Sequence, residues 1–337
     1  MGEIKDIGRS LRSHQCAEAH NMVEVLIPVE EFDVEATLES GQCFRWWRMR
    51  AGEYIGVIGR SAIHVRQVWK RELADPLAPS SRARSGKALL VRFIGGMIPE
   101  EAEHALIRYF DLSRDYPAIL RRLRRDAAFA RVAPRRAGIH ILRQDPFEVI
   151  ISFIISANNH IPRIRGILER LCARYGEEIR TPFGSVYTFP RPEVLAEARL
   201  ADLRERCGLG YRDRYVWRTA RTIAECSDFA SWSEWPTPIL RRRLLELDGV
   251  GEKVADCILL FGFHRLDVFP VDTWIARAMR ELYFPDRVPR VRELHACAVE
   301  RFGAYAGVAQ QYLYAAFRAR GRAARLSREA AAAEEAS

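Results

Sequence analysis

A short glycine-containing turn followed by a strongly apolar segment constrains the fold of this chain more than any other feature. From Leu247 to Trp274 the sequence reads LDGVGEKVADCILLFGFHRLDVFPVDTW. Gly249 and Gly251 permit positive φ and, because they lack a Cβ, let another backbone approach closely. A helix that begins after such a turn presents unpaired N–H groups, which favour an anion such as a phosphate. The pattern is typical of a helix-hairpin-helix element that binds DNA, and the alternative is an ordinary turn between two helices.

Two side chains suited to acid–base or nucleophilic chemistry flank the apolar segment. Lys253 follows the turn, and Asp272 lies about twenty residues later, after a proline. A lysine amine can lose its proton when it is desolvated and then act as a nucleophile, whereas arginine stays protonated. The chain contains only four lysines, at Lys5, Lys70, Lys87 and Lys253. We therefore predict a catalytic lysine and a catalytic aspartate. In the alternative interpretation, Lys253 is solvated and Asp272 is a helix N-cap.

The seven cysteines are dispersed and contain no Cys-x-x-Cys pair. This arrangement predicts reduced thiols and no zinc or iron–sulfur site. Cys257 lies four residues after Lys253, on the same face of the predicted helix. Taken alone, it is better explained as a small core residue.

A net charge of +9 indicates an anionic partner, with nucleic acid as the first candidate. An arginine-rich composition also arises in a GC-rich genome, so charge alone does not decide the partner. The first residues, MGEIKDIGRSLRSHQ, lack the apolar region of a signal peptide. No run of about eighteen apolar residues is present, so we expect no membrane span. We expect a cytoplasmic, prokaryotic protein that acts as a monomer on nucleoid DNA.

The predicted secondary structure changes from mainly strands to mainly helices at about residue 137. Before it, short β-rich runs predict strands at Val23–Ile27, Cys43–Met49, Tyr54–Ile58, Ala62–Val68 and Leu89–Ile94. After it helices dominate, and Asp145-Pro146-Phe147-Glu148 is the strongest helix start, with an Asp N-cap followed by Pro. We predict an α+β fold: a flexible arm at 1–20, an antiparallel-sheet domain at 21–136, a mainly helical domain with the hairpin at 137–325, and a low-complexity tail at 326–337.

Seven sequence blocks carry a resemblance to a known family. They are SGQCFRW (40–46), LRQDPFE (142–148), ISFIISANNHIPRI (151–164), GLGYRDRY (208–215), LDGVGEKVADC (247–257), FPVD (269–272) and YAGVAQ (305–310). The chain resembles the 8-oxoguanine DNA glycosylases of the helix-hairpin-helix glycosylase superfamily over about residues 22–320. The resemblance implies an antiparallel-sheet N-terminal domain followed by two helical subdomains that form a DNA-binding cleft.

The resemblance assigns the chemistry to the two candidates found above. Lys253 matches the nucleophile that attacks C1′ of the damaged nucleotide and forms a Schiff base, which then permits strand cleavage by β-elimination. Asp272 matches the acid that stabilises positive charge developing on the sugar. A helix N-terminus and a desolvated pocket both favour the neutral amine that this chemistry needs. The resemblance implies no redox cofactor and no catalytic metal.

The base pocket is also implied by the resemblance. Gly41 matches the residue whose carbonyl accepts the N7–H that 8-oxoguanine has and guanine lacks, and guanine there would leave an acceptor unpaired at about 1–3 kcal/mol. Gln310 matches a contact to the Watson–Crick edge of the base. Cys257 and Tyr314 match the two faces of a sandwich around the flipped base. Many relatives have phenylalanine in place of Tyr314, so its hydroxyl is a departure from the family pattern.

The resemblance further implies how the duplex is held open. Asn158 matches the residue that fills the space left by the flipped base, and Tyr211 matches the wedge beside it. Arg163 and Arg212 match the arginines that read the cytosine opposite the lesion. From the sequence alone, each has a simpler explanation: a helix C-cap for Asn158, a core position for Tyr211, and phosphate contacts for the arginines. At Trp274 many relatives have a histidine that contacts a phosphate, so this DNA contact is in doubt.

We therefore predict a bifunctional DNA glycosylase/AP lyase that excises 8-oxoguanine, preferably opposite cytosine, from double-stranded DNA in base excision repair. One alternative is a glycosylase for alkylated bases, against which Lys253 and the SGQCFRW block argue. Another is a non-catalytic hairpin module that docks on DNA, which would have no use for Lys253 paired with Asp272. The absence of a four-cysteine iron–sulfur loop argues against the endonuclease-III-like and adenine-glycosylase branches.

Overall fold

An antiparallel sheet of five strands forms the N-terminal part of the chain, in the order β1-β5-β4-β3-β2. The computed structural model describes residues 22–69, 86–94, 99–133 and 138–335, so the predicted arm at 1–20 lies outside the described residues. Neighbouring strands all pair antiparallel, as the sequence predicts. The strands are β1 Met22–Val29, β2 Trp46–Arg50, β3 Glu53–Ile58, β4 Ser61–Trp69 and β5 Lys87–Ile94.

Two helices, α2 (Val34–Leu38) and α4 (Pro99–Tyr109), complete the core of the sheet domain. Trp46 is almost fully buried there, and its indole N–H donates to the Tyr109 hydroxyl at 2.9 Å. Gly56 on β3 lies directly against this ring: a Cβ at Gly56 would be 2.4 Å from it. A glycine in the middle of a strand is therefore explained by the space that the tryptophan needs.

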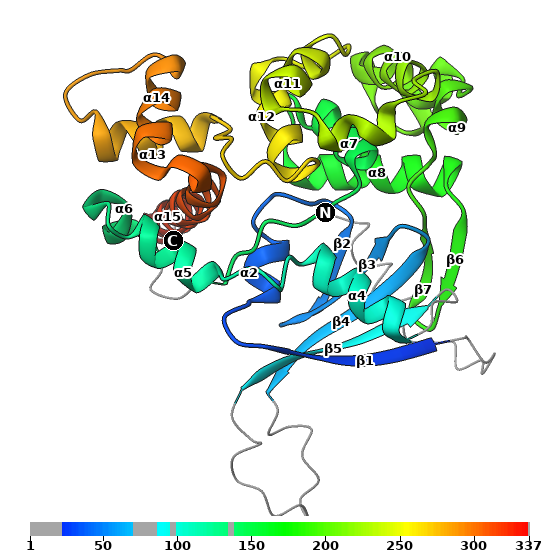
Figure 1. Cartoon of the computed structure of the whole chain (residues 1–337), viewed down its shortest axis with the longest axis horizontal. Helices are drawn as coiled ribbons and strands as arrows, with labels where there is room; N and C mark the ends of the chain where they lie inside the picture. Colours follow the sequence, from blue (N-terminus) through cyan, green and yellow to red (C-terminus); the bar gives the residue numbers. More distant parts are fainter. Residues whose placement is uncertain (1–21, 70–85, 95–98, 134–137, 336–337) are drawn as a thin grey trace, which may run out of the picture.

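Helices form most of the rest of the chain, in two groups that share one hydrophobic core (Figure 1). The first group is α7 Pro146–Ser156, α8 Ile161–Tyr175, α9 Pro192–Ala196, α10 Asp213–Ala224, α11 Thr237–Leu245 and α12 Glu252–Phe261. The second group is α5 Tyr116–Leu123, α6 Ala127–Val132, α13 Thr273–Tyr283, α14 Val291–Phe302 and α15 Ala306–Glu335. The predicted start of α7 is confirmed, because Asp145 accepts the Glu148 N–H at 2.9 Å and Pro146 is the first helical residue.

The segment carrying α5 and α6 packs on helices that follow it by about 150 residues in the sequence (Figure 1). Asp126 accepts from the Tyr283 hydroxyl and from Arg301, each at 2.8 Å, and the Phe129 and Phe302 rings meet edge to face at 5.6 Å. The predicted boundary at 136/137 assigns α5 and α6 to the sheet domain. Their buried side chains, however, belong to the core of the helical region. The domain bounds remain predictions.

A second, two-stranded sheet was not predicted from the sequence. It consists of β6 Glu178–Thr181 and β7 Gly184–Tyr187. Four residues per strand are too few for an alternating pattern to stand out. The hairpin of β6 and β7 contacts the N-terminal part of the chain, because Arg45 donates to the Tyr187 carbonyl. The same Arg45 side chain pairs with Glu148 at 2.9 Å.

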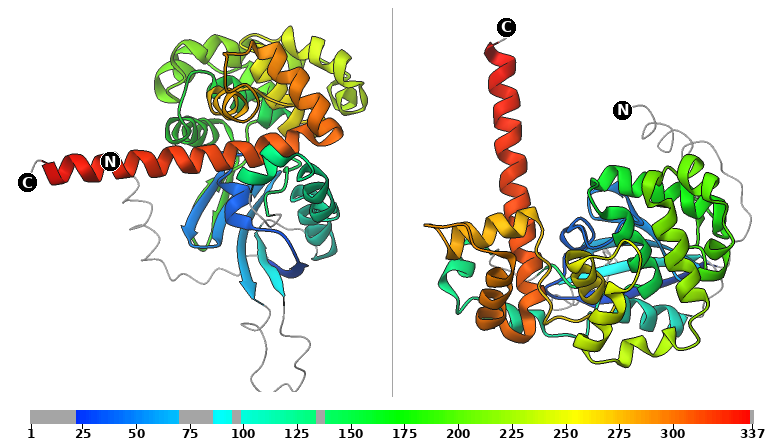
Figure 2. Two further views of the ribbon diagram at one scale, coloured as in Figure 1. Left: turned by 90° about the vertical axis from the view of Figure 1, so that its left-hand side faces the viewer. Right: turned by 90° about the horizontal axis from the view of Figure 1, so that it is seen from above.

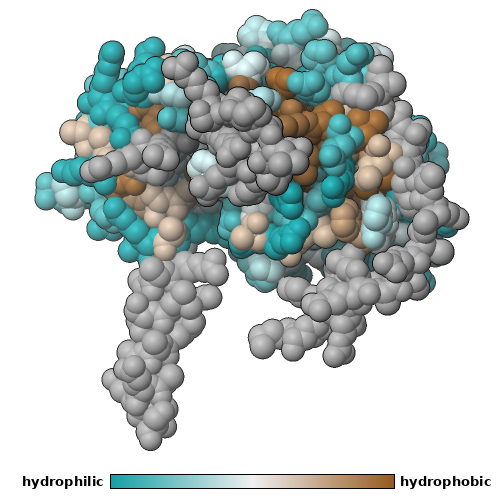
Figure 3. Space-filling view, turned by 90° about the horizontal axis from the view of Figure 1, so that it is seen from below, coloured by the Kyte–Doolittle hydropathy of each residue, from teal (hydrophilic) through white to brown (hydrophobic). Residues whose placement is uncertain are grey.

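The last helix, α15, extends well beyond the rest of the molecule (Figure 2). It runs without a break through the predicted tail boundary at 325/326. No helix in the described part of the chain is long and apolar enough to cross a membrane. From below, apolar areas lie among hydrophilic side chains (Figure 3). Met22, Leu26 and Trp69 are large apolar residues that the sheet exposes, and none of them lines the cavity described next.

Candidate active site

A cavity of about 140 Å³ lies where the loop after α2, helices α7, α8 and α12, and helix α15 meet. Its wall contains all six residues predicted to be catalytic or to hold the base: Gly41, Lys253, Cys257, Asp272, Gln310 and Tyr314. The fold thus brings together residues that are up to 273 positions apart in the sequence.

The two hairpin glycines have different structural roles. Gly249 has φ +82°, and a Cβ there would lie 2.9 Å from the Tyr215 ring. Gly251 is the N-cap of α12, with φ −96° and no heavy atom within 4 Å of the place a Cβ would take. The first glycine is required by backbone conformation and packing, whereas the second leaves the start of α12 open to an approaching backbone.

Lys253 lies in the first turn of α12 and its amine faces an aromatic ring. The Nζ atom is 5.6 Å from the centroid of Phe153, within the range of a cation–π contact. The thiol of Cys257 lies one turn further along the helix and also lines the cavity. Burial raises the pKa of Cys257 to about 11, although the nearby positive charge of Lys253 opposes the shift. Cys257 therefore remains a neutral thiol, and the lysine is the only nucleophile of this pair.

Asp272 is held in a fixed orientation at the start of α13. Its Oδ1 atom accepts the Ile275 N–H at 2.8 Å, so it is the N-cap of that helix. Burial raises the pKa of the Asp272 carboxyl, while the hydrogen bond from Ile275 and the charge of Lys253 oppose the shift. The capping interpretation from the sequence is confirmed, and it is compatible with catalysis because the capping carboxylate also lines the cavity.

The loop that carries Gly41 is held by three glutamine side chains. Gln42 donates to the carbonyls of Thr37 and His140, at 3.2 and 2.8 Å. Gln144 donates to the Gln42 carbonyl at 2.9 Å, and Gln311 donates to the Ser40 carbonyl at 2.7 Å. A loop fixed on both sides in this way presents its backbone groups to the cavity in one geometry.

Gly41 itself needs both its conformation and its lack of a side chain. It has φ +84°, and a Cβ would lie 3.2 Å from both the hydroxyl and a ring carbon of Tyr314. Tyr314 thus closes the cavity against the Gly41 backbone. The positive φ explains why glycine stands at this place in the SGQCFRW block.

Gln310 presents an unpartnered polar atom. The residue is only 5% exposed, and within the described chain its Oε1 atom has no hydrogen-bond partner. A buried acceptor without a partner costs free energy in the empty protein. Its position in the cavity wall points to a ligand with a hydrogen-bond donor.

Asn158, Tyr211 and Arg212 form one cluster beside the cavity. Arg212 is buried. Its Nε donates to the Ala157 carbonyl and its Nη2 donates to the Asn158 carbonyl, each at 3.1 Å. Asn158 is exposed with φ +50°, so Arg212 supports a strained turn. The guanidinium lies 4.3 Å from the centroid of Tyr211, which is 58% exposed. The core position considered for Tyr211 is therefore wrong.

Arg163 and Trp274 lie outside the cavity wall. Arg163 is exposed in the first turn of α8, where its backbone N–H donates to the His160 ring at 3.4 Å. The Trp274 ring packs on α15, so closely that a Cβ at Gly321 would be 2.3 Å from it. The roles predicted for these residues in DNA contact remain predictions.

Comparison with known proteins gives the same picture over nearly the whole chain. Residues 24–150 match the 8-oxoguanine DNA glycosylase N-terminal domain, and residues 151–302 match the HhH-GPD superfamily base excision DNA repair protein family. A probable N-glycosylase/DNA lyase of Methanothermobacter thermautotrophicus is 32% identical over 309 residues, which is 86% of this chain and 94% of that protein. This chain belongs to the 8-oxoguanine DNA glycosylase family.

Other members of the family are similar to a comparable degree. The N-glycosylase/DNA lyase of Saccharomyces cerevisiae is 31% identical, over 77% of this chain and 70% of that protein. The 8-oxoguanine glycosylase/lyase of Clostridium acetobutylicum, solved with double-stranded DNA containing cytosine opposite 8-oxoguanine, is 32% identical with a TM-score of 0.76. The match covers 90% of this chain and 98% of that structure.

Several residues that form or support this cavity were not identified from the sequence. Phe44, Phe153 and Phe261 form its apolar wall, with Phe153 and Phe261 stacked at 5.5 Å. They appear in the sequence as ordinary core residues. Gln42 and Gln311 could have been noticed as polar residues within apolar segments, but their partners are 98 and 271 residues away.

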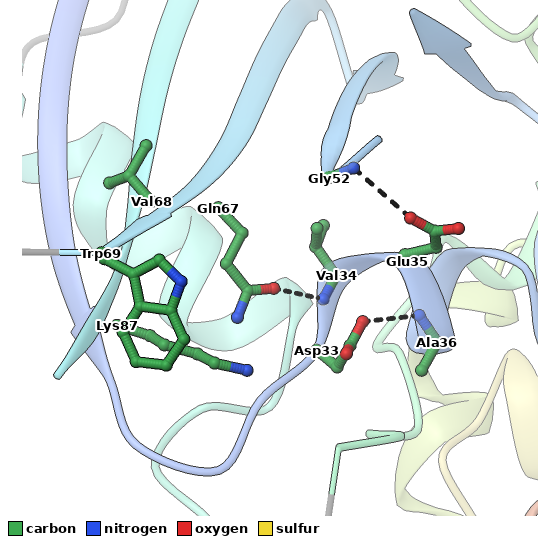
Figure 4. A pocket seen from close by; sticks show the side chains of 9 residues that line it. All are labelled: Asp33, Val34, Glu35, Ala36, Gly52, Gln67, Val68, Trp69 and Lys87. Carbon is green, nitrogen blue, oxygen red and sulfur yellow. Dashed lines mark hydrogen bonds between the residues drawn. The ribbon is translucent and has the colours of Figure 1, made fainter. Parts of the chain in front are cut away.

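A second, larger cavity of about 430 Å³ lies on the sheet domain of this family member (Figure 4). Its polar groups already have partners in the protein: Gln67 accepts the Val34 N–H at 2.8 Å, and Asp33 accepts the Ala36 N–H at 2.8 Å. Lys87 Nζ lies 5.5 Å from the Trp69 ring centroid. The cavity therefore has a lysine and two carboxylates, but both carboxylates are already engaged: Asp33 caps α2, and Glu35 pairs with Arg48 at 3.0 Å.

Proposed function

We propose that Lys253 and Asp272 make this chain a bifunctional DNA glycosylase/AP lyase that removes 8-oxoguanine from duplex DNA in base excision repair. One observation carries the proposal: a lysine amine, a half-buried carboxylate and an unpartnered amide oxygen line the same small cavity. An 8-oxoguanine flipped out of the helix would enter this cavity at a cost of roughly a few kcal/mol in stacking and pairing.

The reaction begins when the neutral amine of Lys253 attacks C1′ as the glycosidic bond breaks. The departing base takes the bonding electron pair and is protonated, while the nitrogen loses a proton. Positive charge develops on the sugar at the transition state, and the fixed carboxylate of Asp272 stabilises it. Opening of the sugar ring gives an imine between Lys253 and C1′.

Strand cleavage follows from this imine. It makes the C2′ protons acidic, and loss of one of them expels the 3′ phosphate by β-elimination. Water then hydrolyses the imine and restores the amine. The neutral thiol of Cys257 lies in the same cavity wall as the lysine and does not compete for the sugar.

Lesion specificity would reside in the part of the cavity opposite the lysine. The N7–H of 8-oxoguanine would donate to the Gly41 carbonyl, which guanine cannot do. A donor on the Watson–Crick edge would satisfy the free Oε1 atom of Gln310. Cys257 and Tyr314 would hold the two faces of the base. We infer a preference for cytosine opposite the lesion, read by Arg163 and Arg212 while Asn158 and Tyr211 fill the gap.

An enzyme with this activity works where DNA is found. That this place is a prokaryotic cytoplasm, and that the protein acts as a monomer, remain predictions.

The test is single-turnover cleavage of duplexes that carry 8-oxoguanine opposite each of the four bases, with undamaged guanine and 3-methyladenine as comparison substrates. We expect base release and strand nicking to be fastest on the pair with cytosine. Excision of 3-methyladenine without excision of 8-oxoguanine would instead support the alkylated-base alternative. Tight binding without any cleavage would support the docking module.

A further inference from the structure

The helix that carries Gln310 and Tyr314 continues outward from the cavity as a basic arm. Residues 318–328 read RARGRAARLSR, with five arginines and no acidic residue. The backbone remains helical to Glu335, and α15 extends well beyond the neighbouring helices (Figure 2).

The arginine positions follow the face of the helix that lines the cavity. At about 100° per residue, positions 318, 322, 325 and 328 all fall within roughly 80° of the direction of Tyr314. Arg318 is at the start of this line: it lies over the Tyr314 ring at 5.9 Å and donates to the Glu39 carbonyl at 3.1 Å. Glu39 precedes the Ser40-Gly41 segment of the cavity wall. This line of arginine positions thus begins at the cavity rim, with Arg318.

The direction of the arm is fixed by the contact between Trp274 and Gly321. A glycine inside a helix costs about 1 kcal/mol relative to alanine. Here only glycine lets α15 pass the indole, because a Cβ would lie 2.3 Å from the ring. Trp274 follows Asp272 by two residues, so the arm is anchored beside the catalytic carboxylate.

The composition of the arm selects its partner. Between residues 322 and 335 the only large apolar residue is Leu326, and the others are alanine, arginine, serine and glutamate. Such a segment has no apolar stripe with which to pack on another protein or a second copy. Its positive charge fits a polyanion, and the substrate that must reach the cavity is one.

We propose that residues 318–328 of α15 form an arm that binds the DNA backbone flanking the lesion. This inference rests on the proposed function only in taking duplex DNA as the substrate. Ten residues of helix span about 15 Å, and DNA carries one phosphate per about 3.4 Å of each strand, so two to four contacts are within reach. Because Trp274 is occupied by α15, the arm supplies phosphate contacts at this side of the cavity.

The test compares the full-length protein with a variant in which Arg322, Arg325 and Arg328 are replaced by glutamine, a residue that preserves helix propensity. Its matched control replaces Arg60, Arg92 and Arg180 by glutamine, which removes the same charge from strands β5 and β6 and from the turn between β3 and β4. Affinity for a duplex with a tetrahydrofuran abasic analogue opposite cytosine is measured between about 50 and 200 mM salt. Excision of 8-oxoguanine at saturating enzyme is measured in parallel.

We expect the slope of log affinity against log salt to be smaller in the arm variant by about two to three. Each phosphate that an arginine no longer neutralises accounts for about 0.9 of this change. The control should keep the wild-type slope, and both variants should keep the wild-type rate of excision at saturation. Equal slopes in the arm variant and the control would overturn the proposal. So would a slower saturated rate with an unchanged slope, because the helix would then support the cavity without touching DNA. If neither the variants nor the wild type excise the base while the slopes differ as expected, the proposed function fails and the arm stands.

Discussion

The two cavities of this molecule differ in how far the protein satisfies its own polar groups. The larger one, on the sheet domain, contains Lys87 and two carboxylates, and its glutamine is bonded at both ends: Gln67 accepts from Val34 N–H and donates to the Phe32 carbonyl, each at 2.8 Å. The smaller one contains Gln310 with a buried oxygen that has no partner among the described residues. Volume alone would have selected the larger cavity and not the proposed active site.

The unpartnered oxygen of Gln310 therefore distinguishes the smaller cavity from the larger one. A buried polar group without a partner lowers the stability of the free protein. At Gln310, a ligand with a hydrogen-bond donor would supply the missing partner.

The largest effect is expected for Lys253→Ala, set against Lys87→Ala in the larger cavity. Loss of the nucleophile should reduce base excision and strand cleavage by roughly 10⁴- to 10⁶-fold, whereas Lys87→Ala should leave both rates unchanged. Single-turnover kinetics on an 8-oxoguanine·cytosine duplex measure this. Equal losses in the two variants would show that neither lysine is the nucleophile.

Asp272→Asn should slow excision by roughly 10²- to 10⁴-fold, because the carboxylate that stabilises the sugar is removed. Asparagine also caps helices, so the fold should be kept. Asp145→Asn, at the N-cap of α7, is the control and should not change the rate. A variant at Asp272 with wild-type kinetics would remove this residue from the mechanism.

The pH dependence of the wild type provides a second test of Asp272. Its pKa is raised by burial, so excision should decline on the acid side at a higher pH than for an ordinary aspartate, and Asp272→Asn should lack this limb. The contribution of Asp272 to the stability of the fold should change with pH in the opposite direction to its contribution to the excision rate. The folded state binds this proton more tightly than the unfolded chain, so the contribution to stability is full below the ordinary pKa of aspartate and is lost as pH rises through the raised pKa. Asp272→Asn should therefore show less loss of stability with rising pH in that interval, as measured by denaturant unfolding.

Gly41→Ala should reduce excision by about 100-fold, because the new Cβ displaces the loop or Tyr314 and misplaces the base. Gly59→Ala is a close control: Gly59 also has positive φ, at +58°, but no heavy atom lies within 4 Å of its Cβ position. Both variants should lose about 1–2 kcal/mol of stability from backbone strain. Only Gly41→Ala should lose activity, and similar activity losses in both would indicate a general effect of strain.

The smallest effects are expected for a pair of Gln→Leu changes. Gln310→Leu should keep or raise the free energy of unfolding, because it removes an unpartnered acceptor, but should lower excision of 8-oxoguanine by about tenfold. Gln67→Leu should lower the free energy of unfolding by about 1–3 kcal/mol, because it leaves the Val34 N–H unpaired, with no effect on excision. If Gln310→Leu is the more destabilising of the two, the distinction between the cavities is lost.

Local sequence signals were sufficient for much of the fold. The cap at Asp145, the first-turn Pro146 and the alternating strands depend on neighbouring residues, and the structure bears them out. The pairing of Lys253 with Asp272 was also predicted, since a glycine turn and a scarce lysine mark it. The features that the sequence did not predict depend on contacts between residues far apart in the chain. The glutamine network around Gly41 and the packing of Trp274 against Gly321 join segments that meet only in the folded chain.

We propose that one lysine, Lys253, forms a covalent imine with the damaged strand. The most direct measurement is borohydride reduction of the wild-type protein on a duplex with 8-oxoguanine opposite cytosine, followed by proteolysis and mass mapping of the adduct. With only four lysines in the chain, the site can be assigned without ambiguity. We predict a single adduct on the peptide that contains Lys253. An adduct on Lys87, on another amine, or on none while 8-oxoguanine is still excised would contradict the claim.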